Sequence, residues 1–196
     1  MLLNRLEFAL MNNPLRAACQ HRVEGKALRE LGGLVTGAKV LEIGCGRGVG
    51  AQIILDQFRA STVHGFDLDP RMVARARRRH ADSGSPTQFW TGDASSIAVA
   101  DDSYDAVFDF GILHHLPDWR AGLSEAFRVL KPGGRLYAEE VLAPFIRATR
   151  HVLTHPQHDR FDALDFRLAM EDAGFVRIRV KPLGRLFAWF VAERPR

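Results

Sequence analysis

The stretch LEIGCGRGVG, residues 41–50, decides the fold, because it joins the end of an apolar segment to three closely spaced glycines. The glycines stand at positions 44, 46 and 48, directly before a second apolar run. A glycine can adopt positive φ and has no Cβ to keep a ligand away from the backbone N–H groups. The stretch therefore predicts a strand, a tight ligand-binding turn and a helix at the carboxyl edge of a parallel sheet.

Outward from this stretch, strand-like and helix-like segments alternate, which is typical of an α/β fold with a doubly wound, mostly parallel sheet and helices on both faces. The expected strands are residues 39–44, 62–68, 87–93, 104–111, 135–141, 176–182 and 185–193. The expected helices are residues 49–58, 69–84, 118–130 and 161–174. Lys131-Pro132-Gly133-Gly134 is expected to stop the third helix. Leu183-Gly184 predicts a turn that makes the last two strands an antiparallel pair.

The length of 196 residues suits one globular domain with a sizeable core and leaves no room for a second. Before residue 35, leucines recur at three- and four-residue spacing, as in a helix, and Asn12-Asn13-Pro14 interrupts them. The sequence therefore predicts an N-terminal helical cap over residues 1–35 and one domain over residues 36–196.

The formal net charge is +4, and four arginines stand in the single segment ARARRRH at residues 74–80. Such a local excess is typical of a solvated helix face, so we expect no nucleic-acid partner. Cys19 and Cys45 form no disulfide framework, which favours a reducing compartment. We find no signal peptide and no apolar run of membrane-spanning length, and we therefore expect a cytoplasmic protein.

Carboxylates stand at the carboxyl ends of the first three expected strands. Glu42 precedes the first glycine by two residues, where its charge would repel a pyrophosphate but attract a cationic amine and sulfonium. Asp67 can accept hydrogen bonds from both hydroxyls of a ribose. Asp93 can accept from an exocyclic adenine amine while the N–H of Ala94 donates to a ring nitrogen. This row of carboxylates favours S-adenosylmethionine as the ligand.

Other readings of the same loop stay open. Gly46, Gly48 and Ala51 also fit the G-x-G-x-x-A pattern of dinucleotide sites, and Asp67 suits either nucleotide. One alternative is therefore an NAD(P)-dependent oxidoreductase. A second alternative is a non-catalytic subunit that binds S-adenosylmethionine, because the same motifs would permit it.

Over about residues 39–142, the chain resembles the class I S-adenosylmethionine-dependent methyltransferases. The resemblance rests on the order and spacing of VLEIGCGRG, GFDLDPRMV, GDASSIAVADDSYDAVF, LHHLPD and RVLKPGG. Within that class, the small quinone-biosynthesis-type methyltransferases of ubiquinone and menaquinone formation look nearest. The resemblance implies a Rossmann-like sheet of seven strands with an antiparallel last strand.

The same resemblance assigns roles around the cofactor. The residues expected to bind it are Glu42, Gly44, Gly46, Gly48, Asp67, Leu68, Met72, Asp93, Ala94, Phe110 and Gly111. The glycines of the loop would line the methionine part and the ribose. Leu68 and Met72 would pack against the adenine. The backbone of Phe110 and Gly111 would meet the methionine end.

Two groups of histidines are candidates for chemistry. His114 and His115 follow the fourth strand, where either imidazole could accept a proton from a hydroxyl or phenol acceptor. His151, His155 and His158 have a spacing that could bring imidazoles to one helical face as metal ligands. Pro156 interrupts that face, and we expect no metal.

The expected reaction is methyl transfer from S-adenosylmethionine to O, C or N of a small molecule, with lipophilic acceptors included, and the expected product is S-adenosylhomocysteine. The chain has VFDFGIL where methyltransferases acting on nucleobase or amide nitrogen carry an N-P-P-Y-like segment. The N-terminal segment up to about residue 35, called the leader below, and the connection over residues 143–160 are the parts expected to cover the acceptor. The leader is also a candidate for peripheral contact with a membrane surface.

Overall fold

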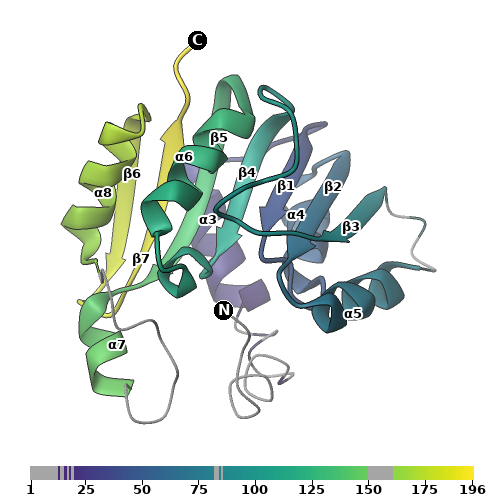
Figure 1. Cartoon of the computed structure of the whole chain (residues 1–196), viewed down its shortest axis with the longest axis horizontal. Coiled ribbons are helices and arrows are strands. Elements are labelled where there is room, and N and C mark those ends of the chain that lie inside the picture. The colour runs from purple at the N-terminus through teal and green to yellow at the C-terminus, as the bar shows by residue number, and fades with distance from the viewer. Residues whose placement is uncertain are drawn as a thin grey trace.

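A computed structural model describes residues 20–81, 86–149 and 161–196 together with the single residues 13, 16, 18 and 84. A seven-stranded sheet forms the centre of the molecule (Figure 1). Its strands are β1 (Lys39–Ile43), β2 (Thr62–Asp67), β3 (Thr87–Thr91), β4 (Tyr104–Phe110), β5 (Leu130–Val141), β6 (Val176–Leu183) and β7 (Phe187–Glu193). The helices are α3 (Gly25–Gly32), α4 (Val49–Phe58), α5 (Pro70–His80), α6 (Trp119–Val129), α7 (Ala143–Thr149) and α8 (Ala163–Asp172). Two short turns of helix complete the set, η1 (Gln20–Glu24) and η2 (Leu113–His115).

The strand order is β3-β2-β1-β4-β5-β7-β6, and the order reverses direction between β1 and β4. β1 pairs in parallel with both β2 and β4, whereas β7 runs antiparallel to β5 and to β6. The doubly wound sheet with an antiparallel last strand is therefore confirmed. In such a sheet the connections diverge at the reversal point, which leaves a crevice at the carboxyl ends of β1 and β4.

Both faces of the sheet are covered, because successive side chains of a strand point to opposite faces. Val40 belongs to a buried cluster with Phe58 of α4, whereas its neighbour Leu41 belongs to a cluster with Trp119 and Leu123 of α6. In Figure 1, α6 lies in front of the sheet and α3 and α4 lie behind it. Burial on both faces explains why the central strands are apolar at nearly every position.

The described part of the expected N-terminal cap packs on the sheet. η1 and α3 are helical as expected, and Leu28 of α3 is fully buried. Tyr137 of β5 donates its hydroxyl to the carbonyl of Gly32 at 2.9 Å. The boundary between a cap and a domain near residue 35 stays a prediction.

Two element bounds differ from the prediction by more than two residues. The segment Lys131-Pro132-Gly133-Gly134 lies inside β5 rather than in a loop before it. Leu130 pairs with Tyr104 and Arg135 with Ala106, so a bulge absorbs the extra residues, and Gly133 takes φ +81° within it. α5 ends at His80, before the expected end at residue 84.

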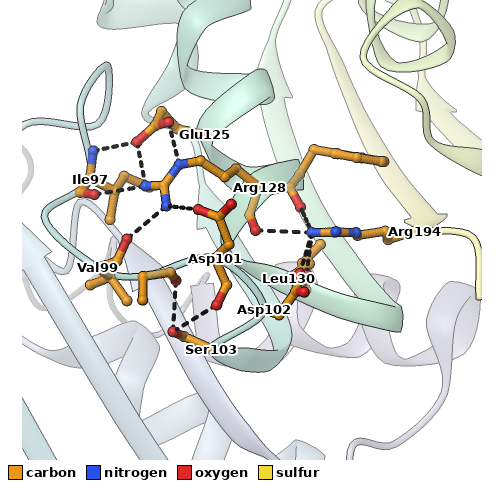
Figure 2. A network of polar contacts seen from close by, with 11 residues as sticks. Ile97, Val99, Asp101, Asp102, Ser103, Glu125, Arg128, Leu130 and Arg194 are labelled. Atoms are coloured by element: carbon orange, nitrogen blue, oxygen red, sulfur yellow. Dashed lines mark hydrogen bonds and ion pairs between the residues drawn. The ribbon is translucent and has the colours of Figure 1, made fainter.

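A polar network joins α6 to the loop that precedes β4 (Figure 2). The guanidinium of Arg128 donates to the carbonyls of Val99 and Ile97 at 2.7 and 2.8 Å. It also pairs with the carboxylates of Asp101 and Glu125, each at 2.7 Å. One side chain therefore provides hydrogen-bond donors for two backbone carbonyls of this loop, which does not pair with a strand at these residues.

We expect Arg128→Ala to lower the free energy of unfolding by about 2 kcal/mol, because two backbone carbonyls and two carboxylates lose a charged donor. Urea denaturation measures the loss. The matched control is Arg167→Ala, which removes an exposed pair with Glu171 and should cost less than about 1 kcal/mol. Equal losses in the two variants would contradict a stabilising role for the network.

Candidate active site

The glycine loop connects β1 to α4 at the carboxyl edge of the sheet. Gly46 takes φ +50°, and no described atom beyond its chain neighbours lies within 4 Å of the position that a Cβ would occupy. At Gly44 the same test places a Cβ 2.2 Å from the side chain of Ile112. The loop is therefore closely packed on one side and open on the other, as a ligand-binding turn requires.

A cavity of about 440 Å³ opens beside this loop. Ten of the expected site residues line it: Glu42, Gly44, Gly46, Asp67, Leu68, Met72, Asp93, Ala94, Phe110 and His115. The structure thus brings together side chains and backbone from the ends of β1, β2, β3 and β4. Three expected residues, Gly48, Gly111 and His114, are not part of the lining.

The three residues outside the lining face other parts of the protein. A Cβ on Gly48 would lie 3.0 Å from the ring of His80, so this glycine packs against α5. A Cβ on Gly111 would point towards His114 and the carbonyl of Glu139. The structure therefore gives no cavity contact to these positions.

Glu42 lies in the cavity wall, and it is only 2% exposed. Its Oε1 lies 1.9 Å from the position of a Cβ on Gly50, so only glycine fits there. Burial raises the pKa of Glu42 well above its usual range, and the nearby charges of Asp67 and Asp109 raise it further. A cation that entered the cavity would relieve this unfavourable burial of a carboxylate.

Asp67 stands at the end of β2 and organises the loop from the opposite side. Its Oδ2 accepts the N–H of Gly46 and its Oδ1 accepts the N–H of Asp69, each at 2.9 Å. Each oxygen has a further lone pair, so the carboxylate can still accept from two ligand hydroxyls. Burial raises its pKa, although the two N–H donors act in the opposite direction.

The expected adenine contacts differ in their exposure. Met72 and Ala94 are buried, whereas Leu68 is 43% exposed at the rim of the cavity. Asp93 is exposed, and its Oδ1 accepts both the N–H and the hydroxyl of Ser95, at 2.9 and 2.7 Å. These bonds fix the turn after β3 and hold the carboxylate at the rim.

The two adjacent histidines have different surroundings. His115 lines the cavity, and its ring centroid lies 4.1 Å from that of His114. His114 is buried, and its Nδ1 lies 2.6 Å from Oε2 of Glu140. Burial raises the pKa of Glu140 to about 7. Of the two candidate bases, only His115 reaches the cavity.

Buried acids at the ends of β4 and β5 accept hydrogen bonds from the backbone of the loop that carries His115. Oε1 of Glu140 accepts the N–H of Leu113 at 3.0 Å, and Oδ1 of Asp109 accepts the N–H of Ile112 at 2.8 Å. Burial and the charge of Glu140 raise the pKa of Asp109 well above its usual range. The histidine is therefore presented by a fixed backbone rather than by a free loop.

Comparison with known proteins relates this site to methyltransferases. A family model described as a methyltransferase domain matches residues 40–134. The solved structure of phosphoethanolamine N-methyltransferase 2 from Haemonchus contortus, in complex with S-adenosylmethionine, superposes with a TM-score of 0.76 at 20% identity. The superposition covers 88% of this chain and 52% of that one. Residues 40–134 thus match a methyltransferase domain, and the fold around them is that of a solved methyltransferase.

Two curated methyltransferases match about half of the chain. A fatty-acid O-methyltransferase from Mycolicibacterium smegmatis is 40% identical over 100 residues, which cover 51% of this chain and 36% of that protein. A phthiotriol/phenolphthiotriol dimycocerosates methyltransferase from Mycobacterium leprae is 33% identical over 106 residues, or 54% of this chain and 38% of that protein. The chain thus spans little more than a third of either relative. The resemblance to quinone-biosynthesis enzymes in particular stays a prediction.

The cavity of the methyltransferase domain fits S-adenosylmethionine at two chemically distinct points. Oε2 of Glu42 is buried and has no hydrogen-bond partner among the described residues, so the N–H of an ammonium would satisfy it. Asp67 offers one unused lone pair on each oxygen for the ribose hydroxyls. The buried carboxyl of Glu42 suits a pyrophosphate poorly, and the alternative of an NAD(P)-dependent oxidoreductase is not favoured.

Several lining residues of the methyltransferase domain were not anticipated from the sequence. Among them are Arg16, Gln20, Arg47, Ile112, Leu116, Pro117 and Asp118. Residues 116–118 follow the two histidines directly, so chain continuity could have placed them. Arg16 and Gln20 come from the leader, and no sequence pattern connects them to the glycine loop.

Among the residues that the structure describes, no group of three or more histidine, cysteine, aspartate or glutamate side chains could hold a metal ion. His151, His155 and His158 lie outside the described residues. Within the described parts of the chain, the helices are too short or too polar to cross a membrane.

Proposed function

We propose that the protein transfers a methyl group from S-adenosylmethionine to an oxygen atom of a small, lipophilic molecule. The observation that carries the proposal is one cavity that contains both the buried carboxyl of Glu42 and the imidazole of His115. Ile112, Leu116 and Pro117 add an apolar wall on the side of the histidine. The similarity to a fatty-acid O-methyltransferase supports an oxygen acceptor on an apolar chain.

S-adenosylmethionine supplies a methyl group on a sulfonium, which makes the carbon open to direct displacement. In the proposed site, Glu42 holds the amine, Asp67 holds the ribose and Met72 packs against the adenine. Most of the rate of such a displacement comes from alignment of the two reactants in a dry site. His115 accepts the proton when the acceptor is a hydroxyl or phenol.

The leader is proposed to cover the acceptor side of this cavity. Arg16 and Gln20 line it, although both precede the first strand. Arg16 forms an ion pair with the buried Glu24 and lies 3.9 Å from Glu139 at the end of β5. These contacts tie the described part of the leader to the sheet edge, where a cover would exclude water.

Calorimetry and turnover test the proposal separately. Titration with S-adenosylmethionine, S-adenosylhomocysteine and NAD should give binding of the first two only. Turnover with labelled methyl groups should then be screened with a fatty acid, a long-chain phenol and phosphoethanolamine. Binding of NAD alone would overturn the cofactor, and methylation of phosphoethanolamine alone would overturn the lipophilic oxygen acceptor. Cofactor binding without turnover of any acceptor would favour a non-catalytic binding subunit.

We expect Asp67→Ala to weaken S-adenosylhomocysteine binding by about 30-fold, because a carboxylate that accepts two ribose hydroxyls contributes about 2 kcal/mol. Calorimetry measures the change. Asp56→Ala is the matched control, since it removes the same charge from an exposed position of α4 outside the cavity lining. Similar affinities for the two variants would reject the ribose role of Asp67.

We expect the affinity for S-adenosylhomocysteine to rise with pH above the range in which a carboxyl usually ionises, because Glu42 attracts the amine only when it is ionised. Its raised pKa moves this ionisation upwards from the usual range of a carboxyl. The stability of the ligand-free protein depends on pH in the opposite direction. Its free energy of unfolding falls as the pH rises, since a group with a raised folded-state pKa loses its stabilising contribution as the pH rises through that pKa. Calorimetry across this range should show a flatter profile for Glu42→Gln. An unchanged slope in that variant would assign the pH dependence to another group.

A further inference from the structure

The last turn of α5 is bonded to the backbone of the glycine loop. Nε of Arg79 donates to the carbonyl of Arg47 at 3.0 Å. Nε2 of His80 lies 2.9 Å from the carbonyl oxygen of Gly48. A carbonyl oxygen can only accept, so Nε2 carries a proton and donates. Two consecutive side chains of one helix thus hold two consecutive carbonyls of the loop.

The loop and α5 are also in direct steric contact. Gly48 takes φ +79°, and a Cβ there would lie 3.0 Å from two atoms of the His80 ring and 3.2 Å from Cα of Ala76. His80 itself is only 5% exposed. A side chain at position 48 would therefore be crowded against the helix, and the positive φ also favours glycine there.

The helix is anchored independently of the loop. Asp69 caps its first turn by accepting the N–H of Arg71 at 2.9 Å. Arg77 donates from Nε and Nη2 to the carbonyl of Phe89 on the edge strand β3, at 3.0 and 2.6 Å. Val73 packs in the buried cluster on that face of the sheet. α5 is thus a fixed support against which the loop can be held.

The opposite side of the loop is held by β2. The N–H of Cys45 donates to the carbonyl of Phe66 at 2.8 Å, and the N–H of Gly46 donates to Asp67. The segment between residues 45 and 48 is therefore clamped from two directions. Gly46, which is bonded to β2, and Arg47, which is bonded to α5, both line the cavity.

We propose that His80 and Arg79 are positioning residues for the glycine loop. They set the affinity for S-adenosylmethionine although they do not line its cavity. A loop that is already held in its bound shape loses less conformational freedom when the ligand binds, so the ligand binds more tightly. The sequence predicted only a solvated helix face for the basic segment at residues 74–80. In this proposal, two of its residues hold the glycine loop. The inference rests on the proposed function, because the loop must bind this cofactor.

Two pairs of variants test the proposal by calorimetry with S-adenosylhomocysteine. Arg79→Gln and Arg78→Gln remove the same charge from neighbouring exposed positions, but only Arg79 donates to Arg47. We expect Arg79→Gln to weaken binding by about threefold or more and Arg78→Gln to leave it unchanged. His80→Gln can place an amide nitrogen near the position of Nε2, whereas His80→Asn reaches only as far as Nδ1. We expect His80→Asn to weaken binding by about tenfold and His80→Gln to retain most of the affinity.

Melting temperatures and amide exchange separate positioning from general stability. If His80 only fills space in the core, affinity should follow the melting temperature equally in both His80 variants, which would overturn the proposal. If it positions the loop, amide exchange at Gly46 and Gly48 should accelerate in ligand-free His80→Asn and not in His80→Gln. Normal binding by wild type together with unchanged affinity in Arg79→Gln and His80→Asn would overturn this inference alone. A wild-type protein that binds no S-adenosylhomocysteine would overturn the proposed function, and the inference with it.

Discussion

Gly46→Val should lower the affinity for S-adenosylhomocysteine by at least about 100-fold while the domain stays folded. At φ +50° a β-branched residue is strained, and its two γ-carbons would extend into the space beside the loop. Gly46 lines the cavity, so that space is where the ligand must approach the backbone. The substitution therefore acts on the ligand directly and on the shape of the loop that Asp67 and α5 hold.

Gly37→Val separates these two effects from backbone strain alone. Gly37 takes φ +75°, and no described atom beyond its chain neighbours lies within 4 Å of the position that a Cβ would occupy. It precedes β1, however, and so lies at the opposite end of that strand from the glycine loop. We expect both variants to have lower melting temperatures and only Gly46→Val to lose binding in calorimetry. Normal binding by Gly46→Val would show that the cofactor does not approach this loop.

The sequence was sufficient for most of the fold because its local signals agree with burial. α4 spans Val49–Phe58 as predicted, since glycine marks its start and apolar residues continue through it. The predicted start of β5 was wrong, because strand pairing in the folded protein overrides the local preferences of the sequence there. Pro132 and the two glycines after it would normally end an element, but pairing with β4 carries the strand through them as a bulge. A single sequence contains no signal for that register.

The site was predictable where chemistry follows chain order, and not where distant segments meet. Glu42 and Asp67 stand at strand ends, and parallel strands bring such ends to one edge. The sequence could not separate His114 from His115, because the distinction depends on Glu140 lying under the first of them. The bond from His80 to Gly48 depends likewise on how α5 crosses the loop.

His115→Ala should lower turnover by about 100-fold with a hydroxyl or phenol acceptor and leave S-adenosylhomocysteine affinity within about twofold of wild type. Its imidazole lies in the cavity, whereas His114 is turned into the protein towards Glu140. His21→Ala is the control, because His21 is exposed and lies outside the cavity lining. Rates with labelled methyl groups and calorimetry on the same preparations measure the two quantities.

The acceptor itself decides whether His115 acts as a base or only as a wall of the site. A fatty acid is already ionised near neutral pH, so its methylation requires no proton acceptor, whereas a phenol must lose its proton as the new bond forms. If His115 is the base, His115→Ala should slow the phenol reaction by about 100-fold and the fatty-acid reaction far less. Equal losses with both acceptors would mean that the side chain only aligns the acceptor. Full turnover with both would remove His115 from the mechanism and leave catalysis to the alignment that the glycine loop and the leader provide.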